Sequence, residues 1–470
     1  MKHYFLKRVG LAVILSTFFS CGKDFLDVPP STVVVRQQYI SDMKTASEFL
    51  NGIISNLTQL YSTSNGVYAD LAADNVRPLE TETDKELLTK YKWAMIVDGA
   101  SSSQVNLNSL WLYGYAVASN SSFLLEVIGK FEKEDMEMAK QIKGSALFLR
   151  AFAHFQMVNI FAQPYFFSGD AMHMGIPYIT TSDWQSPVTR QTVADVYEKM
   201  VADLRIAIPL LKDGTQSVNE LTITRNAAKG LLARIYLYKR DFANAKILAK
   251  EVSRDVPIMT SYNYPADLFT QNDKESLFRL PPEQKSFLAL YPGYYFRLLS
   301  QLFATSDIAI LLNERPNDVR KSWVAHFGSN WTVTKFPTAA TGAPIPELDY
   351  YLPIIRSSEM YLTAAESYAQ LGQEDSARLF LDAIRQRADS TALDCLAIGK
   401  ALLDTIYKER RKELCFEDFR LFDLLRLGKG VDRIDALPGS SHLPYPSNKA
   451  IAPIPLLDIQ TSGLQQNPGY

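Results

Sequence analysis

The chain has 470 residues, 47% of them hydrophobic, and a formal net charge of −2 at pH 7. A chain of this length can bury a large core or several. The charge balance argues against a nucleic-acid partner, because phosphate binding depends on an excess of Lys and Arg that this composition lacks.

The N-terminus has the pattern of a secretory signal peptide, which we place at residues 1–20. A positively charged start precedes an apolar run over residues 9–19 that is too short to span a bilayer. Cys21 follows and is predicted to carry a lipid anchor, with residues 21–40 as a linker to the folded body. The alternative is an ordinary signal peptide with a structural cysteine nearby. No other run reaches about 18 apolar residues, so no membrane-spanning helix is predicted.

Residues 41–255 are predicted to form an N-terminal helical region. In TVADVYEKMVADLRIAIPLL, which begins at Thr192, apolar residues recur at helical spacing along one face. Thr192 is expected to cap this helix, with Asp195 three residues further on, and Pro209 to end it. Similar stripes predict helices over residues 105–130, 138–162, 224–253, 355–390 and 400–427.

Two segments share a pattern of small and aromatic residues with the same spacing of three and then nine positions. They contain Ala233, Tyr236 and Ala245, and Ala365, Tyr368 and Ala377. Small residues would let two antiparallel helices approach closely, and the tyrosine would fill the space beside them. The pattern is similar to the tetratricopeptide helix pair. The sequence therefore predicts a mainly α fold, a tetratricopeptide-like helix-pair superhelix whose C-terminal helices occupy residues 353–430.

Residues 256–352 separate the two helix pairs and lack a sustained helical period. This segment is rich in prolines and aromatic residues, and residues 60–100 are irregular in the same way. Because binding residues are concentrated in loops on a rigid scaffold, we expect these segments to form an irregular, aromatic-rich ligand-binding lobe. Residues 431–470 are predicted to be a tail that packs on the body.

The predicted ligand-binding residues in these segments combine aromatic rings with polar groups. A sugar ring stacks its CH face on Trp or Tyr, and its hydroxyls need polar partners at the edge of the ring. The candidate rings are Trp93, Tyr294, Trp323 and Trp331, and the candidate polar groups are Asn75, Arg77, Asn330 and Lys335. For each tryptophan, packing in the core is the alternative interpretation.

The segment ERRKELCFEDFRLFDLLR, from Glu409 to Arg426, alternates acids and arginines around an apolar stripe. Interpreted as one helix, it places acids four residues apart with arginines between them. This spacing favours structural ion pairs that stabilise the fold over a catalytic acid/base site. Cys415 lies in this segment and could pair with Cys395 or remain a buried thiol. The sequence has no metal-ligand spacing, phosphate loop or nucleophile motif, so we predict no catalytic residue, metal or cofactor.

Several motifs together resemble the SusD/RagB family of outer-membrane nutrient-binding lipoproteins. They are, in chain order, KDFLDVPPS, FLRAFAHFQMVNIFAQP, IIRSSEMYLTAAES, the Glu409 segment, PIPLLDI and the terminal QNPGY. The resemblance covers nearly the whole chain after the signal peptide. Two departures are Gln163, where a Gly is usual before the Pro, and His154, where a Tyr is common.

This resemblance implies a cell-surface lipoprotein of the outer membrane, held by Cys21 and seated on a SusC-like TonB-dependent transporter. Such a protein would capture oligosaccharide and deliver it to the transporter without catalysis. A RagB-like peptide-binding import subunit is the nearest alternative, and a surface glycosidase is a more distant one, since the sequence singles out no pair of carboxylates.

Overall fold

The computed structural model describes residues 39–61, 63–79, 85–97, 107–183, 185–216, 222–280, 295, 301–337 and 351–470. Helices dominate these ranges and strands are few and short, so the predicted mainly α fold is confirmed. No helix in these ranges is long and apolar enough to cross a membrane. The predicted signal peptide, the linker with Cys21, and Tyr294 lie outside the described residues.

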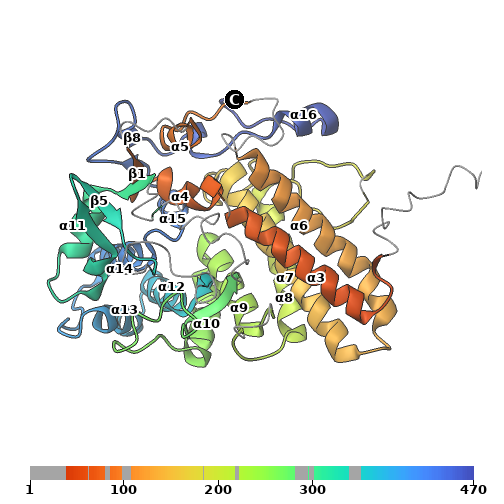
Figure 1. The fold of residues 1–470 in the computed structure, drawn as a ribbon, viewed down its shortest axis with the longest axis horizontal. Helices are drawn as coiled ribbons and strands as arrows, with labels where there is room; N and C mark the ends of the chain where they lie inside the picture. The colour runs from red at the N-terminus through yellow and green to blue at the C-terminus, as the bar shows by residue number, and fades with distance from the viewer. Residues whose placement is uncertain are drawn as a thin grey trace, which may run out of the picture.

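Four long helices form one side of the molecule, where α7 packs against α3, α6 and α8 (Figure 1). The Thr192 hydroxyl accepts a hydrogen bond from the Asp195 backbone N–H at 3.1 Å, so the predicted cap of α8 is confirmed. Pro209 lies in the last turn of α8, one residue before its end. The helices of this part are α3 (Met43–Thr58), η3 (Gln59–Tyr61), η4 (Thr63–Val67), α4 (Tyr68–Leu71), α5 (Lys85–Tyr91), α6 (Asn108–Val127), η5 (Ile128–Phe131), α7 (Met136–Phe161) and α8 (Val193–Leu210).

The two predicted helix pairs are α9 (Arg225–Tyr238) with α10 (Phe242–Asp255), and α12 (Ser357–Gln370) with α13 (Glu374–Ala388). The four alanines of the shared pattern are completely buried, which allows the close approach expected of them. Because α10 also packs against α12, the two pairs stack in space although a long insertion separates them in sequence. The tetratricopeptide-like superhelix is therefore continuous, and the insertion projects from it (Figure 1).

Two antiparallel strands, β2 (Ser276–Leu280) and β6 (Leu352–Arg356), pair where the insertion leaves and rejoins the helices. Further out, β1 (Val76–Pro78), β3 (Leu302–Ala304), β5 (Asn330–Val333) and β4 (Val324–Phe327) form a four-stranded sheet in that order. The sheet joins the segment around residue 77 to the insertion. The described part of the insertion also contains α11 (Ser306–Asn313) and η8 (Val319–Trp323), so it is more regular than expected. Strands this short show too little alternation to be recognised in a sequence.

The charged segment does not form one helix, contrary to the prediction. α14 (Gly399–Leu414) ends before Cys415, and α15 (Arg420–Arg426) begins after a turn in which Phe416 and Asp418 have φ angles of 67° and 62°. Cys415 and Cys395 are both buried free thiols, so the disulfide alternative is not realised. Burial raises the pKa of the Cys415 thiol to about 12.

The C-terminal tail runs from α4 and α5, where Arg433 donates to the backbone oxygens of Leu71 and Tyr91, to the end of α7. The Asn467 side-chain amide, from the QNPGY motif, donates to the backbone oxygens of Phe161 (2.9 Å) and Ala452 (2.7 Å). The backbone N–H of Ala452 in turn donates to the oxygen of Ile160 at 2.8 Å, which fixes the tail to the end of α7. The short elements of the tail are β7 (Val431–Asp432), β8 (His442–Leu443), η10 (Asn448–Ala450) and α16 (Leu456–Ser462).

Candidate ligand-binding site

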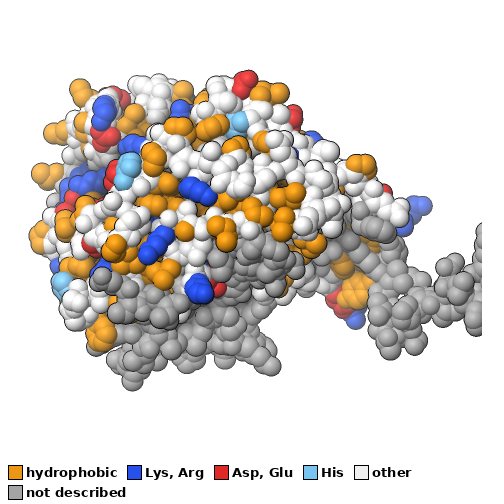
Figure 2. Space-filling model, turned by 90° about the horizontal axis from the view of Figure 1, so that it is seen from above, with side chains coloured by type: hydrophobic (Ala, Val, Ile, Leu, Met, Phe, Trp, Pro, Cys, Tyr) orange, Lys and Arg blue, Asp and Glu red, His pale blue; other side chains and the backbone are white. Residues whose placement is uncertain are grey.

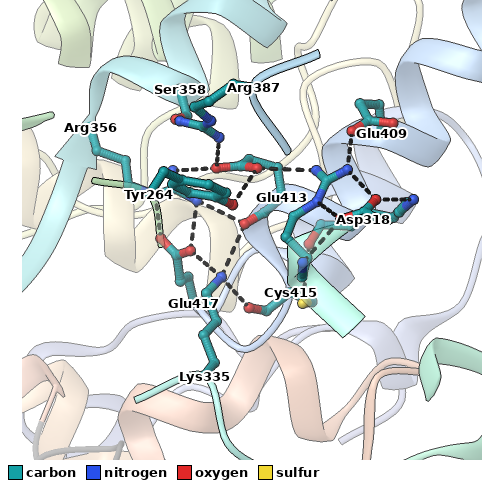
Figure 3. A network of polar contacts seen from close by, with 12 residues as sticks. Tyr264, Asp318, Lys335, Arg356, Ser358, Arg387, Glu409, Glu413, Cys415 and Glu417 are labelled. Carbon is teal, nitrogen blue, oxygen red and sulfur yellow. Dashed lines mark hydrogen bonds and ion pairs between the residues drawn. The ribbon is translucent and has the colours of Figure 1, made fainter. Parts of the chain in front are cut away.

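A buried network of charges surrounds Glu413, the last acid of α14 (Figure 3). Its carboxylate accepts hydrogen bonds from Arg356 (2.7 Å), Arg387 (2.7 Å) and Arg320 (3.1 Å), and from the Tyr264 hydroxyl (3.0 Å). Burial by itself would raise the pKa of Glu413. The three guanidinium groups outweigh that effect and hold its pKa well below the usual range.

The neighbouring acids are satisfied in the same way. Glu417 accepts from Arg356 and from Lys335, while Glu409 and Asp318 accept from Arg320. The prediction that these charges brace the framework agrees with this geometry. The predicted pairing with arginines of the same segment is wrong for Glu409, Glu413 and Glu417, whereas Asp423 and Arg426 do pair within α15. The arginines come from η8, β6 and α13, since a buried carboxylate needs more cationic donors than its own helix face supplies.

Trp93 and Trp323, two of the predicted ligand platforms, lie in the core instead. Trp93 is 7% exposed, and its indole N–H donates to the Ala72 backbone oxygen at 2.8 Å. Trp323 is 2% exposed and meets the Tyr264 ring edge to face, with centroids 6.0 Å apart. Neither ring presents a face to solvent in this structure, so the core-packing alternative applies to both.

Two of the predicted polar groups also have structural partners. The Asn75 side chain is buried, donates to Asp70 at 2.8 Å, and accepts from Arg411 at 3.0 Å. The Lys335 ammonium is buried below the Trp323 ring and donates to the backbone oxygens of Glu413 and Cys415. These groups hold segments of the fold together and do not lie at the edge of an open site.

The remaining predicted residues, Arg77, Asn330 and Trp331, come together on the four-stranded sheet, at the partly exposed end of β4 and β5. Asn330 accepts a hydrogen bond from Arg77 at 2.9 Å, across strands far apart in sequence. Consecutive strand residues point to opposite faces, so Trp331 lies on the other face of the sheet from Asn330. The structure thus gives two small groups, one on each face.

Trp331 is paired with a residue that the sequence interpretation missed. His326 lies directly opposite it in the β4–β5 hairpin, and the ring centroids are 3.5 Å apart with planes tilted by 35°. His326 is exposed and Trp331 is partly buried. In the sequence, Gly328 is the signal for this pair, because glycine is typical of the first position of a two-residue hairpin turn. In the structure Gly328 has a φ of 62°, and the turn sets the register that places residue 326 opposite residue 331.

The face of the molecule seen from above carries charged and apolar side chains interspersed (Figure 2). On the described part of that face, acidic and basic side chains lie close to each other without a broad field of one sign. A mixed surface of this kind does not attract polyanions strongly.

Comparison with known proteins identifies the family. Residues 24–237 match a family model described as starch-binding, associating with outer membrane, and residues 322–470 match the model of the SusD family. SusD superfamily proteins from Bacteroides thetaiotaomicron and Bacteroides vulgatus share the fold. The first has a TM-score of 0.82 at 26% identity, covering 91% of this chain and 100% of that protein.

The Bacteroides vulgatus protein has a TM-score of 0.82 at 24% identity, covering 91% of this chain and 99% of that protein. SusD-like protein P25 from Formosa agariphila is 20% identical over 97% of each chain. The two family matches together include most of the helical segments, and the structural similarity extends over 91% of the chain. The chain belongs to the SusD/RagB family of outer-membrane-associated proteins.

Proposed function

We propose that this protein is a non-catalytic lipoprotein of the outer-membrane surface, anchored through Cys21, which binds oligosaccharide and delivers it to a SusC-like TonB-dependent transporter. The observation that carries the proposal is the tilted His326–Trp331 ring pair at the partly exposed end of the four-stranded sheet. The starch-binding description of the matched family supports a glycan as the ligand class.

The pair has the chemistry that a sugar requires. The apolar CH face of a pyranose packs on an indole, and the imidazole beside it can exchange hydrogen bonds with sugar hydroxyls. One such contact is weak, so tight capture of a long glycan depends on several sugar units meeting the protein at once. On the opposite face, the Arg77–Asn330 pair offers polar groups to a chain that wraps the hairpin.

The absence of catalysis is proposed from the state of the carboxylates. Glycoside hydrolysis needs two carboxyl groups that converge on a bond in an open cleft. In the described part of the chain, the acids around Glu413 are buried and paired with arginines and Lys335. Such acids cannot reach a glycosidic bond without dismantling the core.

The test is isothermal calorimetry of the purified protein with a panel of polysaccharides and peptides. Trp331→Ala is expected to weaken binding of the preferred glycan about tenfold, which corresponds to about 1.4 kcal/mol. Tyr262→Ala is the matched control, because Tyr262 is an aromatic residue that is 92% exposed and lies outside the hairpin. Equal affinities of the two variants for the glycan would show that the hairpin is not part of the binding site. Binding of peptides without binding of any glycan would favour the RagB-like peptide-binding alternative. Hydrolysis of a glycan by the purified protein would contradict a role in binding alone.

Delivery to the transporter requires a stable complex of the two proteins in the membrane. Solubilisation of the outer membrane in mild detergent should therefore recover a TonB-dependent transporter together with this chain. Cys21→Ser should release the chain from the membrane fraction, because the anchor is proposed to reside on that thiol. Retention of the variant in the membrane would contradict lipid attachment at this cysteine.

A further inference from the structure

A groove of about 610 Å³ lies between α10 of the first helix pair and α12 and α13 of the second. None of the hairpin residues lines it, so it is separate from the proposed glycan site. One wall is basic and comes from α10, and the other is aromatic and comes from α12 and α13. The residues that the argument uses are Lys246, Lys250 and Arg254 on the first wall, and Tyr361, Tyr368 and Phe380 on the second.

The aromatic rings pack on one another more than they face the solvent. Phe380 stacks on Tyr368, with centroids 5.7 Å apart and planes 15° apart, and it meets Tyr361 edge to face at 5.6 Å. The Lys246 ammonium lies 5.4 Å from the centroid of the Tyr368 ring. Because the ring faces are largely occupied, this wall is an apolar surface and not a platform for a sugar ring. Ile247, which is 50% exposed, extends the apolar surface across the groove.

The basic wall has more positive charge than its own neighbours neutralise. Lys250 is exposed and forms no ion pair with any residue of the described ranges. In the part of the chain that the structure describes, the one ion pair of Arg254 is with the adjacent Asp255, at 2.8 Å. Glu251, the acid that lines the groove, forms an ion pair with Lys229 at 2.8 Å. The groove is therefore locally positive in a chain whose net charge is −2.

A polar group at the bottom of the basic wall lacks a partner. The Ser253 side chain is 4% exposed, lines the groove, and its hydroxyl makes no hydrogen bond within the described structure. Buried hydroxyls are normally satisfied, so this one is a polar group that the described part of the fold leaves without a partner. The backbone oxygen of Ser253 is already used, because it accepts from the Tyr361 hydroxyl at 3.4 Å.

We propose that this groove binds an acidic polypeptide segment that carries a large apolar side chain between its carboxylates. The apolar side chain would lie between Ile247 and Phe380, and the carboxylates would pair with the ammonium groups of Lys250 and Lys246. Stacked helix pairs offer extended grooves of this kind to polypeptides. Aliphatic Ile247 and the mutually stacked rings suit a protein side chain better than a sugar. The proposal concerns a partner-binding surface and does not depend on the glycan site.

The experiment measures fluorescence anisotropy of a labelled peptide with a central Leu-Phe flanked by Asp and Glu, titrated with the purified full chain. Lys250→Glu is expected to weaken binding about tenfold, since it replaces an attraction by a repulsion. Ile247→Ser, at a half-exposed position that does not endanger folding, is expected to weaken it several-fold through lost apolar contact. Lys133→Glu is the control, with the same charge change at an exposed lysine outside the groove, and should leave the affinity unchanged.

The affinity should also fall as salt is added, since exposed charges are screened. A peptide with Lys in place of its acids should not bind. Equal binding of the acidic and basic peptides overturns the proposal, as does equal affinity of Lys250→Glu and Lys133→Glu. Saturable binding of polygalacturonate fragments that Lys250→Glu abolishes, without binding of the acidic peptide, would also overturn it and make the groove a site for anionic glycans.

Discussion

The Glu413 network and the β4–β5 hairpin both gather residue types that often mark functional sites, but they differ in their contact with water. Glu413, Arg356 and Arg387 have side chains that are no more than 3% exposed, and each is held by several partners. His326 is exposed and lies against the ring of Trp331, which is itself partly buried. The first region is closed to any ligand, whereas the second is open to one.

The difference shows that residue type alone does not identify a site. A carboxylate taken out of water needs cationic donors, so a run of alternating acids and arginines is what a buried framework of charges requires. An aromatic residue beside polar groups becomes a binding surface only where its ring is left open. Each of the following predictions tests one side of this contrast.

Glu413→Gln should have the largest effect, because it removes the negative charge that three buried guanidinium groups share and places an NH2 donor against them. We expect the free energy of unfolding to fall by about 3–5 kcal/mol, measured by urea denaturation. The control is Glu198→Gln. The Glu198 side chain is 61% exposed and, among the described residues, forms an ion pair with Lys239 alone, so the substitution should change the stability by about 1 kcal/mol or less. Similar losses in both variants would mean that burial does not distinguish the network.

Trp323→Ala should lower the free energy of unfolding by roughly 3 kcal/mol, because it leaves a cavity beside Tyr264 and removes the ring that lies 4.1 Å from the Lys335 ammonium. Thermal and urea unfolding followed by circular dichroism measure the loss. Should this variant keep its stability and lose glycan binding, the assignment of Trp323 to the core would be wrong.

Asp74→Asn should remove a stabilisation that depends on pH. Burial by itself would raise the pKa of Asp74, but Arg420 and Arg411 lower it from 3.8 to about 2. A carboxyl whose pKa is lower in the folded protein stabilises the fold above pH 3.8, and this contribution is lost as the pH falls towards 2. The pH-dependent part of the difference in free energy of unfolding between the native chain and Asp74→Asn should be about 2 kcal/mol near neutral pH. It should disappear as the pH approaches about 2. Urea denaturation of both proteins across this range measures it, and a constant difference would contradict the charge-based explanation.

Trp331→Ala should have the smallest effect on the fold, about 1 kcal/mol or less, because its ring is partly exposed and lies between the edge of the core and exposed His326. The same denaturation experiment as for Trp323→Ala measures it. A loss as large as that of the buried tryptophan would make Trp331 a core residue and would leave the hairpin without an open aromatic ring.

Much of the helical fold could be predicted from local patterns. The Thr192 cap, the end of α8 beside Pro209 and the alanine–tyrosine pattern of the two helix pairs each depend on residues within about a dozen positions. Helical periodicity and capping are local effects, so a sequence displays them directly. The break after Leu414 was missed, because the apolar stripe continues through a turn whose left-handed residues, Phe416 and Asp418, are not glycines.

The candidate site could be predicted only in part. Arg77, Asn330 and Trp331 do meet on one sheet, but which face each side chain occupies depends on strands of three or four residues. The residues next to Trp93 and Trp323 in the sequence do not distinguish a buried ring from an exposed one. Segments far away in the chain bury these rings, as Arg433 does for Trp93.

The amino-acid sequence by itself determined the family, the helices and the pairing of helices into repeats, because these depend on order, spacing and periodicity along the chain. Only the tertiary structure decided which arginine meets which acid and which aromatic ring stays open. Partners of Glu413 come from residues 320, 356 and 387, and His326 meets the partly exposed Trp331 ring only once a hairpin has formed. Burial is a property of the packed molecule, and it depends on contacts between segments that no local pattern encodes.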